Sequence, residues 1–189
     1  MQTIGIYGGT FDPIHRGHLH VINHVLTHEL VDYLLVIPSG EPWLREHQPL
    51  AGGADRVAMC ALAISELPQD IKNRIDVSPL EIDRSGPSYM IDTVEAVQAN
   101  HPGSQLILIL GSDAAEHLHR WHRAGELQEL VDVLIVERPD QVPGKGIDIQ
   151  ALPISATQVR AEIVGSANSS AIPPIVATYI KEHGLYGSK

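Results

Sequence analysis

Short apolar runs alternate with longer amphipathic stretches through the first two thirds of the chain. The short runs are rich in aliphatic residues and predict strands at 3–7, 33–37, 75–82, 106–110 and 133–136. Several of them are apolar at consecutive positions, as in parallel strands that are covered on both faces. The longer stretches predict helices at 17–30, 54–67 and 88–100 and within 113–130. This order predicts right-handed βαβ units, and therefore an α/β fold with a doubly wound, mainly parallel sheet.

The last third of the chain has a different pattern. It predicts a turn-rich linker and two closing helices, at 141–146, 155–164 and 173–183. Ser155 followed by Gln158 fits a capping box at the start of the first of these helices. We expect one domain over residues 1–189, with a core of about 1–140 and a small C-terminal helical portion of about 147–189.

Composition and charge narrow the class of protein. A length of 189 residues fits one domain. The 13 Lys and Arg against 23 Asp and Glu give a net charge of −10, which argues against a general nucleic-acid binder. A locally positive cleft for a phosphorylated small molecule remains compatible with that charge. Cys60, the single cysteine, forms neither an internal disulfide nor a Cys-pair zinc site.

The apolar runs also bear on the location of the protein. The densest run, at 106–110, is far shorter than the roughly 20 residues of a membrane span. Residues 1–9 have no basic start and no long apolar core, so we expect no secretory signal. We expect a cytoplasmic protein with no membrane partner.

The first candidate for chemistry is the segment GGTFDPIHRGH at 8–18, which follows the first predicted strand. It has neither the GxGxxG fingerprint of dinucleotide-binding folds nor the spacing of a P-loop. Its glycines allow the backbone to approach a ligand closely. His15 and His18 are three residues apart and share one face of a helical turn, and the free N–H groups of that turn favour phosphate.

Other interpretations of this segment remain open on local physics alone. A tight strand–helix turn with two surface histidines explains the same residues about as well as a phosphate site. Two histidines at this spacing also resemble half of a metal site. No carboxylate or cysteine has a spacing that completes such a site, so we expect no protein residue to ligate a metal.

A second segment, ISATQVR at 154–160, favours the phosphate interpretation. It brings Ser155, Thr157 and the guanidinium of Arg160 to the start of another predicted helix. A helix N-terminus with a permanently charged, forked donor suits a polyphosphate. Alone, the segment would be read as a capped helix with a solvated arginine. Two helix N-termini suited to binding an anion in one chain make that explanation less satisfactory.

Together these segments resemble those of a known enzyme family. GGTFDPIHRGH is similar to the GGxFxPxHxGH signature of HxGH nucleotidyltransferases, and ISATQVR is similar to their ISxTxxR motif. The resemblance to bacterial nicotinate-nucleotide adenylyltransferases runs nearly end to end. It includes PSGEPWLR at 38–45, Arg56 with Met59, PSYMIDT at 87–93, Gly111 with Asp113 and Trp121, and YIKEHGLY at 179–186.

The resemblance implies a Rossmann-like fold and a reaction. ATP would transfer its adenylyl group to nicotinate mononucleotide, giving deamido-NAD and pyrophosphate in NAD biosynthesis, with Mg²⁺ accompanying ATP. The phosphate of the mononucleotide is mostly dianionic at neutral pH, since its second pKa is about 6. It would therefore attack directly and in line, with no general base and no covalent intermediate. The oligomeric state stays open, a homo-oligomer included.

The resemblance also implies which residues act on ATP. His18, His15 and Arg160 would be the catalytic residues, aligning and neutralising the phosphates. The full set of ATP-binding residues would be Gly8, Gly9, Thr10, Phe11, His15, Gly17, His18, Gly111, Asp113, Ile154, Ser155, Thr157 and Arg160.

A second implied set binds the mononucleotide. Trp121 would stack on the pyridine ring, and Ser39, Gly40 and Arg45 would meet the phosphate. The full set would be Ser39, Gly40, Trp43, Arg45, Tyr89, Met90, Thr93, Trp121 and His122. Met90 stands where the family usually has Thr, and Arg45 where it usually has Lys. The choice between the acid and amide mononucleotides therefore remains open.

Other functions are compatible with parts of this pattern. An adenylyltransferase for nicotinamide mononucleotide or phosphopantetheine would share both phosphate-binding motifs. A non-catalytic nucleotide-sensing module would be expected to have lost one of His15, His18 and Arg160, and all three are present. A purely structural protein leaves the two anion-friendly helix starts unexplained.

Overall fold

The computed structural model describes residues 1–43, 47–137, 146–165 and 169–188. Its centre is a five-stranded sheet with the strand order β3-β2-β1-β4-β5, in which every neighbouring pair is parallel. The strands are β1 (Thr3–Gly9), β2 (Tyr33–Pro38), β3 (Ile75–Val77), β4 (Gln105–Gly111) and β5 (Asp132–Val136). The predicted doubly wound sheet is confirmed, and it is wholly rather than mainly parallel.

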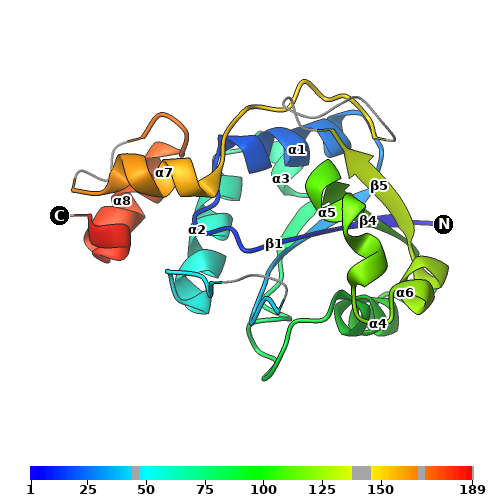
Figure 1. Ribbon diagram of the computed structural model, residues 1–189. Helices are drawn as coiled ribbons and strands as arrows, with labels where there is room; N and C mark the ends of the chain where they lie inside the picture. The colour runs from blue at the N-terminus through cyan, green and yellow to red at the C-terminus, as the bar shows by residue number, and fades with distance from the viewer. Residues whose placement is uncertain (44–46, 138–145, 166–168, 189) are drawn as a thin grey trace.

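Helices cover both faces of this sheet (Figure 1). Those before β4 are α1 (Arg16–Thr27), α2 (Gly53–Ser65), α3 (Gln69–Lys72) and α4 (Met90–Asn100). Those after it are α5 (Ser112–Glu116), α6 (Ala124–Leu130), α7 (Ala156–Ile163) and α8 (Pro174–Glu182). Two 3₁₀ turns, η1 (Leu118–Arg120) and η2 (Leu185–Gly187), complete the described elements. Within the described ranges, no helix is both long and apolar enough to cross a membrane.

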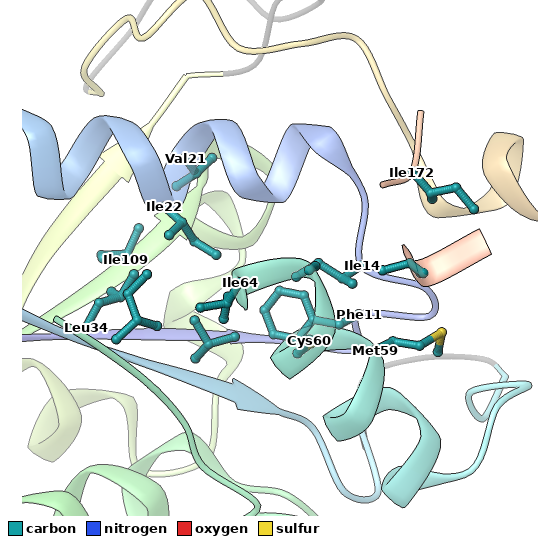
Figure 2. Close-up of a cluster of buried hydrophobic side chains, with 14 of the residues drawn as sticks. Phe11, Ile14, Val21, Ile22, Leu34, Met59, Cys60, Ile64, Ile109 and Ile172 are labelled. Carbon is teal, nitrogen blue, oxygen red and sulfur yellow. The ribbon is translucent and has the colours of Figure 1, made fainter. Parts of the chain in front are cut away.

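Each face of the sheet has its own hydrophobic core. One core joins α1 and α2 to the sheet, and Figure 2 shows Phe11, Ile22 and Met59 within it. The C-terminal helices α7 and α8 pack into the same core through Val159, Ile163, Val176 and Ile180. The other core lies between the sheet and α4, η1 and α6. Because both faces of the sheet are covered, consecutive residues of a strand pack into opposite cores, and both must be apolar.

The strand order changes direction at β1. The chain moves outward from β1 to β2 and β3, then crosses back to place β4 on the other side of β1. Ligands bind beyond the carboxyl ends of strands at such a point. The segments after β1 and β4 are therefore the expected place for a site.

Three elements differ from the sequence-based prediction. The strand predicted at 75–82 ends at Val77, because Pro79 has no N–H with which to extend the ladder. The short helix α3 was not predicted. The stretch 113–130 is broken into three short helical pieces, since Trp121 is extended and Arg123 adopts a left-handed conformation with φ of 53°.

The start of α7 agrees only in part with the predicted capping box. The Gln158 backbone N–H donates to Ser155 Oγ at 3.2 Å, as expected for the cap. The side chain of Gln158 instead donates to Glu162 Oε1 at 3.3 Å, so the reciprocal half of the box is a wrong prediction. The predicted linker at 141–146 lies outside the described residues except for Gly146.

Candidate active site

The carboxyl ends of β1 and β4 open into a cavity of about 480 Å³, which we call the first cavity. The segment after β1 contributes Gly8, Gly9, Thr10, Phe11, His15, Gly17 and His18 to its lining. The segment that leads into α7 contributes Ile154, Ser155 and Gln158, and the end of β4 contributes Gly111 and Asp113. The two helix starts therefore converge on one cavity, although most of the chain separates them.

The two histidines of the first motif hold each other in place at the start of α1. Their rings stack with centroids 3.7 Å apart, and Phe11 packs edge-on against His18 at 4.9 Å. The backbone N–H of His15 donates to Nδ1 of His18 at 3.2 Å. Because Nδ1 accepts, the neutral His18 ring carries its proton on Nε2. That assignment makes Nε2 a hydrogen-bond donor.

Arg160 lies against the first motif. Its Nη1 donates to the backbone oxygen of Asp12 at 2.7 Å and lies 3.9 Å from Asp12 Oδ2. Its Nη2 donates to Thr157 Oγ1 at 3.2 Å. The guanidinium is thus fixed between the two motifs, and about a quarter of the side chain (26%) is exposed.

A buried network fixes the loop that follows β1. The carboxylate of Asp12 accepts the backbone N–H groups of Leu50 at 2.8 Å and Ala51 at 3.1 Å. Arg56 donates to the backbone oxygens of Thr10 at 2.8 Å and Ala51 at 3.2 Å. Burial lowers the pKa of the Arg56 guanidinium, although the Asp12 carboxylate opposes that shift. Asp12 has no role in the sequence-based prediction, and Arg56 enters it only as part of a motif.

A second cavity of about 280 Å³ adjoins the first, because both are lined by Gly8, Gly9, Thr10, Leu110 and Ala114. Its other lining residues include Ser39, Trp43, Glu81, Ser88, Met90, Trp121 and His122. Most of the residues expected to bind a mononucleotide are thus gathered in one place. The shared residues lie at the carboxyl ends of β1 and β4 and on α5, where the two cavities meet.

The comparisons with known proteins identify the family of the chain. A family model described as cytidylyltransferase-like matches residues 6–162. A protein of Geobacillus kaustophilus, described as a probable nicotinate-nucleotide adenylyltransferase, is 35% identical over 100% of this chain and 88% of its own length. A Saccharopolyspora erythraea protein with the same description is 36% identical over 98% of this chain and 90% of its own.

The chain belongs to the nicotinate-nucleotide adenylyltransferase family. Solved structures agree with this assignment at the level of the fold. The nicotinic acid mononucleotide adenylyltransferase of Plasmodium falciparum, complexed with NaAD, has a TM-score of 0.81 at 22% identity, with 98% of each chain covered. The same enzyme complexed with APC has a TM-score of 0.78 at 22% identity. The Rossmann-like fold expected for the family is therefore confirmed.

Aromatic side chains form a stack at the second cavity of this family member. Tyr89 stacks on His122 with centroids 4.2 Å apart, and Trp43 packs edge-on against Tyr89 at 5.4 Å. Trp43 is 42% exposed. Tyr89 therefore supports two residues that line the cavity.

Thr93, another residue expected to bind the mononucleotide, is not among the residues that line the second cavity. It is fully buried and donates from Oγ1 to Glu81 Oε1 at 2.8 Å. Glu81, the partner of Thr93, is among the residues that line the cavity. Glu81 has no distinguishing pattern in the sequence, and the strand predicted at 75–82 places it in a ladder rather than in the turn that the structure shows.

Gly40 is packed against the same turn. A Cβ on Gly40 would lie 2.2 Å from the backbone oxygen of Glu81, so no larger residue fits. Ser88 Oγ accepts the backbone N–H groups of Gly40 and Glu41, each at 3.0 Å. These contacts fix the segment after β2 beside the second cavity. Arg45, expected to meet the mononucleotide phosphate, lies outside the described residues.

Proposed function

We propose that this protein transfers the adenylyl group of ATP to nicotinate mononucleotide, forming deamido-NAD and pyrophosphate. The observation that carries the proposal is the junction of the two cavities at Gly8, Gly9 and Thr10. A cavity lined by two helix starts suits a triphosphate. A neighbouring cavity lined by Trp121 and His122 suits a flat heteroaromatic ring.

The chemistry requires alignment rather than a nucleophilic side chain. A phosphate oxygen of the mononucleotide attacks the α-phosphorus of ATP, and a new phosphorus–oxygen bond forms. The bond from the α-phosphorus to the oxygen bridging it to the β-phosphate breaks, and its electron pair leaves with pyrophosphate. The attacking phosphate is already mostly dianionic at neutral pH, so no general base is needed. The protein must hold both phosphates in line and neutralise the charge that develops.

The described residues are suited to those tasks. His18 presents Nε2–H as a donor for an oxygen at the α-phosphate, and the N-terminus of α1 adds backbone N–H groups. Arg160 would bind the β- and γ-phosphates, with Ser155 and Thr157 beside it. Gly111 lets the chain approach the adenosine, and Asp113 would accept a ribose hydroxyl.

Mg²⁺ would enter with ATP. Within the described residues, no group of three or more His, Cys, Asp or Glu side chains could hold a metal ion. Mg²⁺ is commonly held by substrate phosphates with one or two carboxylates, and Asp113 and Glu137 both line the first cavity. When bound, the ion would neutralise charge on the triphosphate.

Nicotinamide mononucleotide is the second candidate substrate, and Met90 is the reason. Met90 lines the second cavity and has only a weakly accepting thioether, so its side chain offers no donor to a nicotinate carboxylate. Glu81, on the same cavity, is an acceptor that suits an amide better than an acid. Backbone N–H groups near His122 remain the donors for the acid.

Pyrophosphate release from ATP, measured with each of three acceptors, tests the proposal. We expect the highest kcat/KM with nicotinate mononucleotide, lower values with nicotinamide mononucleotide, and no release above background with phosphopantetheine. Release with phosphopantetheine alone would contradict the proposal. ATP binding without release for any acceptor would favour a nucleotide-sensing module.

A further inference from the structure

The C-terminal turn reaches the loop that follows β1. Tyr186 Oη donates to Asp12 Oδ1 at 2.7 Å, which joins residues near opposite ends of the sequence. Tyr186 has a left-handed backbone with φ of 55°, between Gly184 at 60° and Gly187 at 71°. A non-glycine residue adopts that conformation at a cost, so surrounding contacts must hold it there.

Contacts on both sides hold the turn. Ser188 is buried, and its Oγ donates to the backbone oxygens of Ile180 at 3.1 Å and Leu185 at 2.8 Å. The backbone N–H of Gly165, just after α7, donates to the oxygen of Gly187 at 3.2 Å. The turn is therefore tied to α8 and to the end of the helix that carries Arg160.

Asp12 links Tyr186 to Arg160. Asp12 is 4% exposed, and its carboxylate accepts hydrogen bonds from Tyr186 and from the backbone of Leu50 and Ala51. Its backbone oxygen accepts Nη1 of Arg160 at 2.7 Å. The same Nη1 lies 3.9 Å from Oδ2, too far for a hydrogen bond but close enough for attraction.

We propose that Tyr186 is a positioning residue for adenylyl transfer. Its phenol O–H supplies a hydrogen bond to the Asp12 carboxylate, and this bond keeps the Arg160 guanidinium in place for the triphosphate of ATP. This inference rests on the proposed function of Arg160. Without the phenol O–H, Asp12 Oδ1 keeps only the N–H of Ala51 at 3.1 Å, and a buried carboxylate with fewer donors is less well stabilised. The carboxylate would then recover a donor by drawing Arg160 toward itself and away from the phosphates.

The phenol remains a donor over the working range of pH. Burial raises the pKa of Tyr186, and the neighbouring Asp12 carboxylate raises it further. The group therefore stays protonated, and its effect on ATP binding is expected to be independent of pH between 6 and 9.

Tyr186→Phe tests the proposal, because it removes one O–H and keeps the ring. We expect kcat/KM for ATP to fall about tenfold, which is the typical effect of one hydrogen bond of 1–1.5 kcal/mol. The KM for the mononucleotide is expected to stay within twofold. The ATP dissociation constant, measured without mononucleotide, should rise by a similar factor. That binding measurement remains informative if the protein turns over no nicotinate mononucleotide, so the two proposals fail separately.

Tyr179→Phe is the matched control. Tyr179 Oη, on α8, donates to Asp55 Oδ1 at 3.0 Å, which is the same type of bond at the same end of the chain. Asp55 lies on α2 and lines neither described cavity. A merely structural role for both tyrosines would lower both melting temperatures and leave ATP kinetics alike. Equal ATP kinetics in the two variants would overturn the proposal.

Two further measurements strengthen the test. In an Arg160→Ala background, Tyr186→Phe should cause no additional loss of ATP affinity, since its effect acts through Arg160. Full additivity would contradict the proposal.

If Tyr186→Phe does not fold, Gly187→Ala is a second variant that strains the same turn. A Cβ on Gly187 would meet no atom within 4 Å, so the strain comes only from its φ of 71°, which disfavours alanine. Gly103→Ala, at φ of 83° and equally open, is its control and should leave ATP affinity unchanged.

Discussion

Gly17 faces Ile154 across the junction of the two motifs. A Cβ on Gly17 would lie 3.6 Å from the Cβ of Ile154 and 3.0 Å from Nδ1 of His15. The start of α1 therefore lies beside the segment that leads into α7, at a distance where a methyl group on Gly17 would make ordinary van der Waals contact with Ile154. The tight neighbour of Gly17 is the His15 ring, next to the cavity that the two helix starts share.

Gly17→Ala is expected to lower activity more than stability. The added methyl group would push the His15 ring from its stack with His18, and positions of phosphate-binding donors matter at the scale of an ångström. We expect kcat/KM for ATP to fall at least about tenfold, measured by pyrophosphate release. Gly125→Ala is the control: its Cβ meets no atom within 4 Å, on helix α6. It should keep full activity and gain about 0.5–1 kcal/mol of stability. Full activity in Gly17→Ala would contradict a role for the His15 ring in positioning the phosphate-binding donors.

His18→Ala is expected to lower kcat about 10²–10³-fold, because one donor aimed at transition-state charge contributes about that much. The melting temperature should change little. The control is His24→Ala on the same helix, whose ring stacks on His28 at 3.9 Å outside both cavities. That variant should retain its turnover. A His18 variant with most of its turnover would remove His18 from the mechanism.

Met90→Thr is expected to raise the preference for the acid mononucleotide. A threonine hydroxyl can donate to the nicotinate carboxylate, and a hydrogen bond to a charged group contributes about 1.5–3 kcal/mol. The ratio of kcat/KM for nicotinate over nicotinamide mononucleotide should therefore rise at least about tenfold. Met90→Leu, which keeps the volume and adds no donor, should leave that ratio within threefold. An equal shift in both variants would show that shape, not hydrogen bonding, sets the preference.

Cys60 is expected to be unreactive in the folded protein. Its side chain is fully buried on α2, and burial raises the pKa of the thiol well above its usual range. An exposed thiol is about half ionised at pH 8.5, whereas Cys60 stays protonated there. Alkylation at pH 8.5 should be slow in buffer and fast in denaturing urea, as measured by mass increase. Rapid alkylation without urea would contradict the burial of α2 against the core.

The order of the elements and the two helix starts follow from local patterns in the amino-acid sequence. Consecutive apolar residues in β1, β2 and β4 specify strands buried on both faces, and that signal is local. The cap formed by Ser155 is local as well, since its partner is the N–H of Gln158. Family motifs added the expected site residues, because each motif is a short contiguous string.

Which of these residues come into contact depends on the packing of the whole fold. Asp12 accepts a hydrogen bond from Tyr186 at its carboxylate and another from Arg160 at its backbone oxygen. No spacing in the sequence predicts hydrogen bonds between segments so far apart. The surroundings of Thr93 were unpredictable for the same reason: its partner Glu81 lies in a turn where the sequence predicts the end of a strand. Local hydrogen bonding and periodicity fix each helix and strand, whereas contacts between distant segments depend on how the crossovers pack against the sheet. The chemistry of the site therefore depends on packing that no single segment specifies.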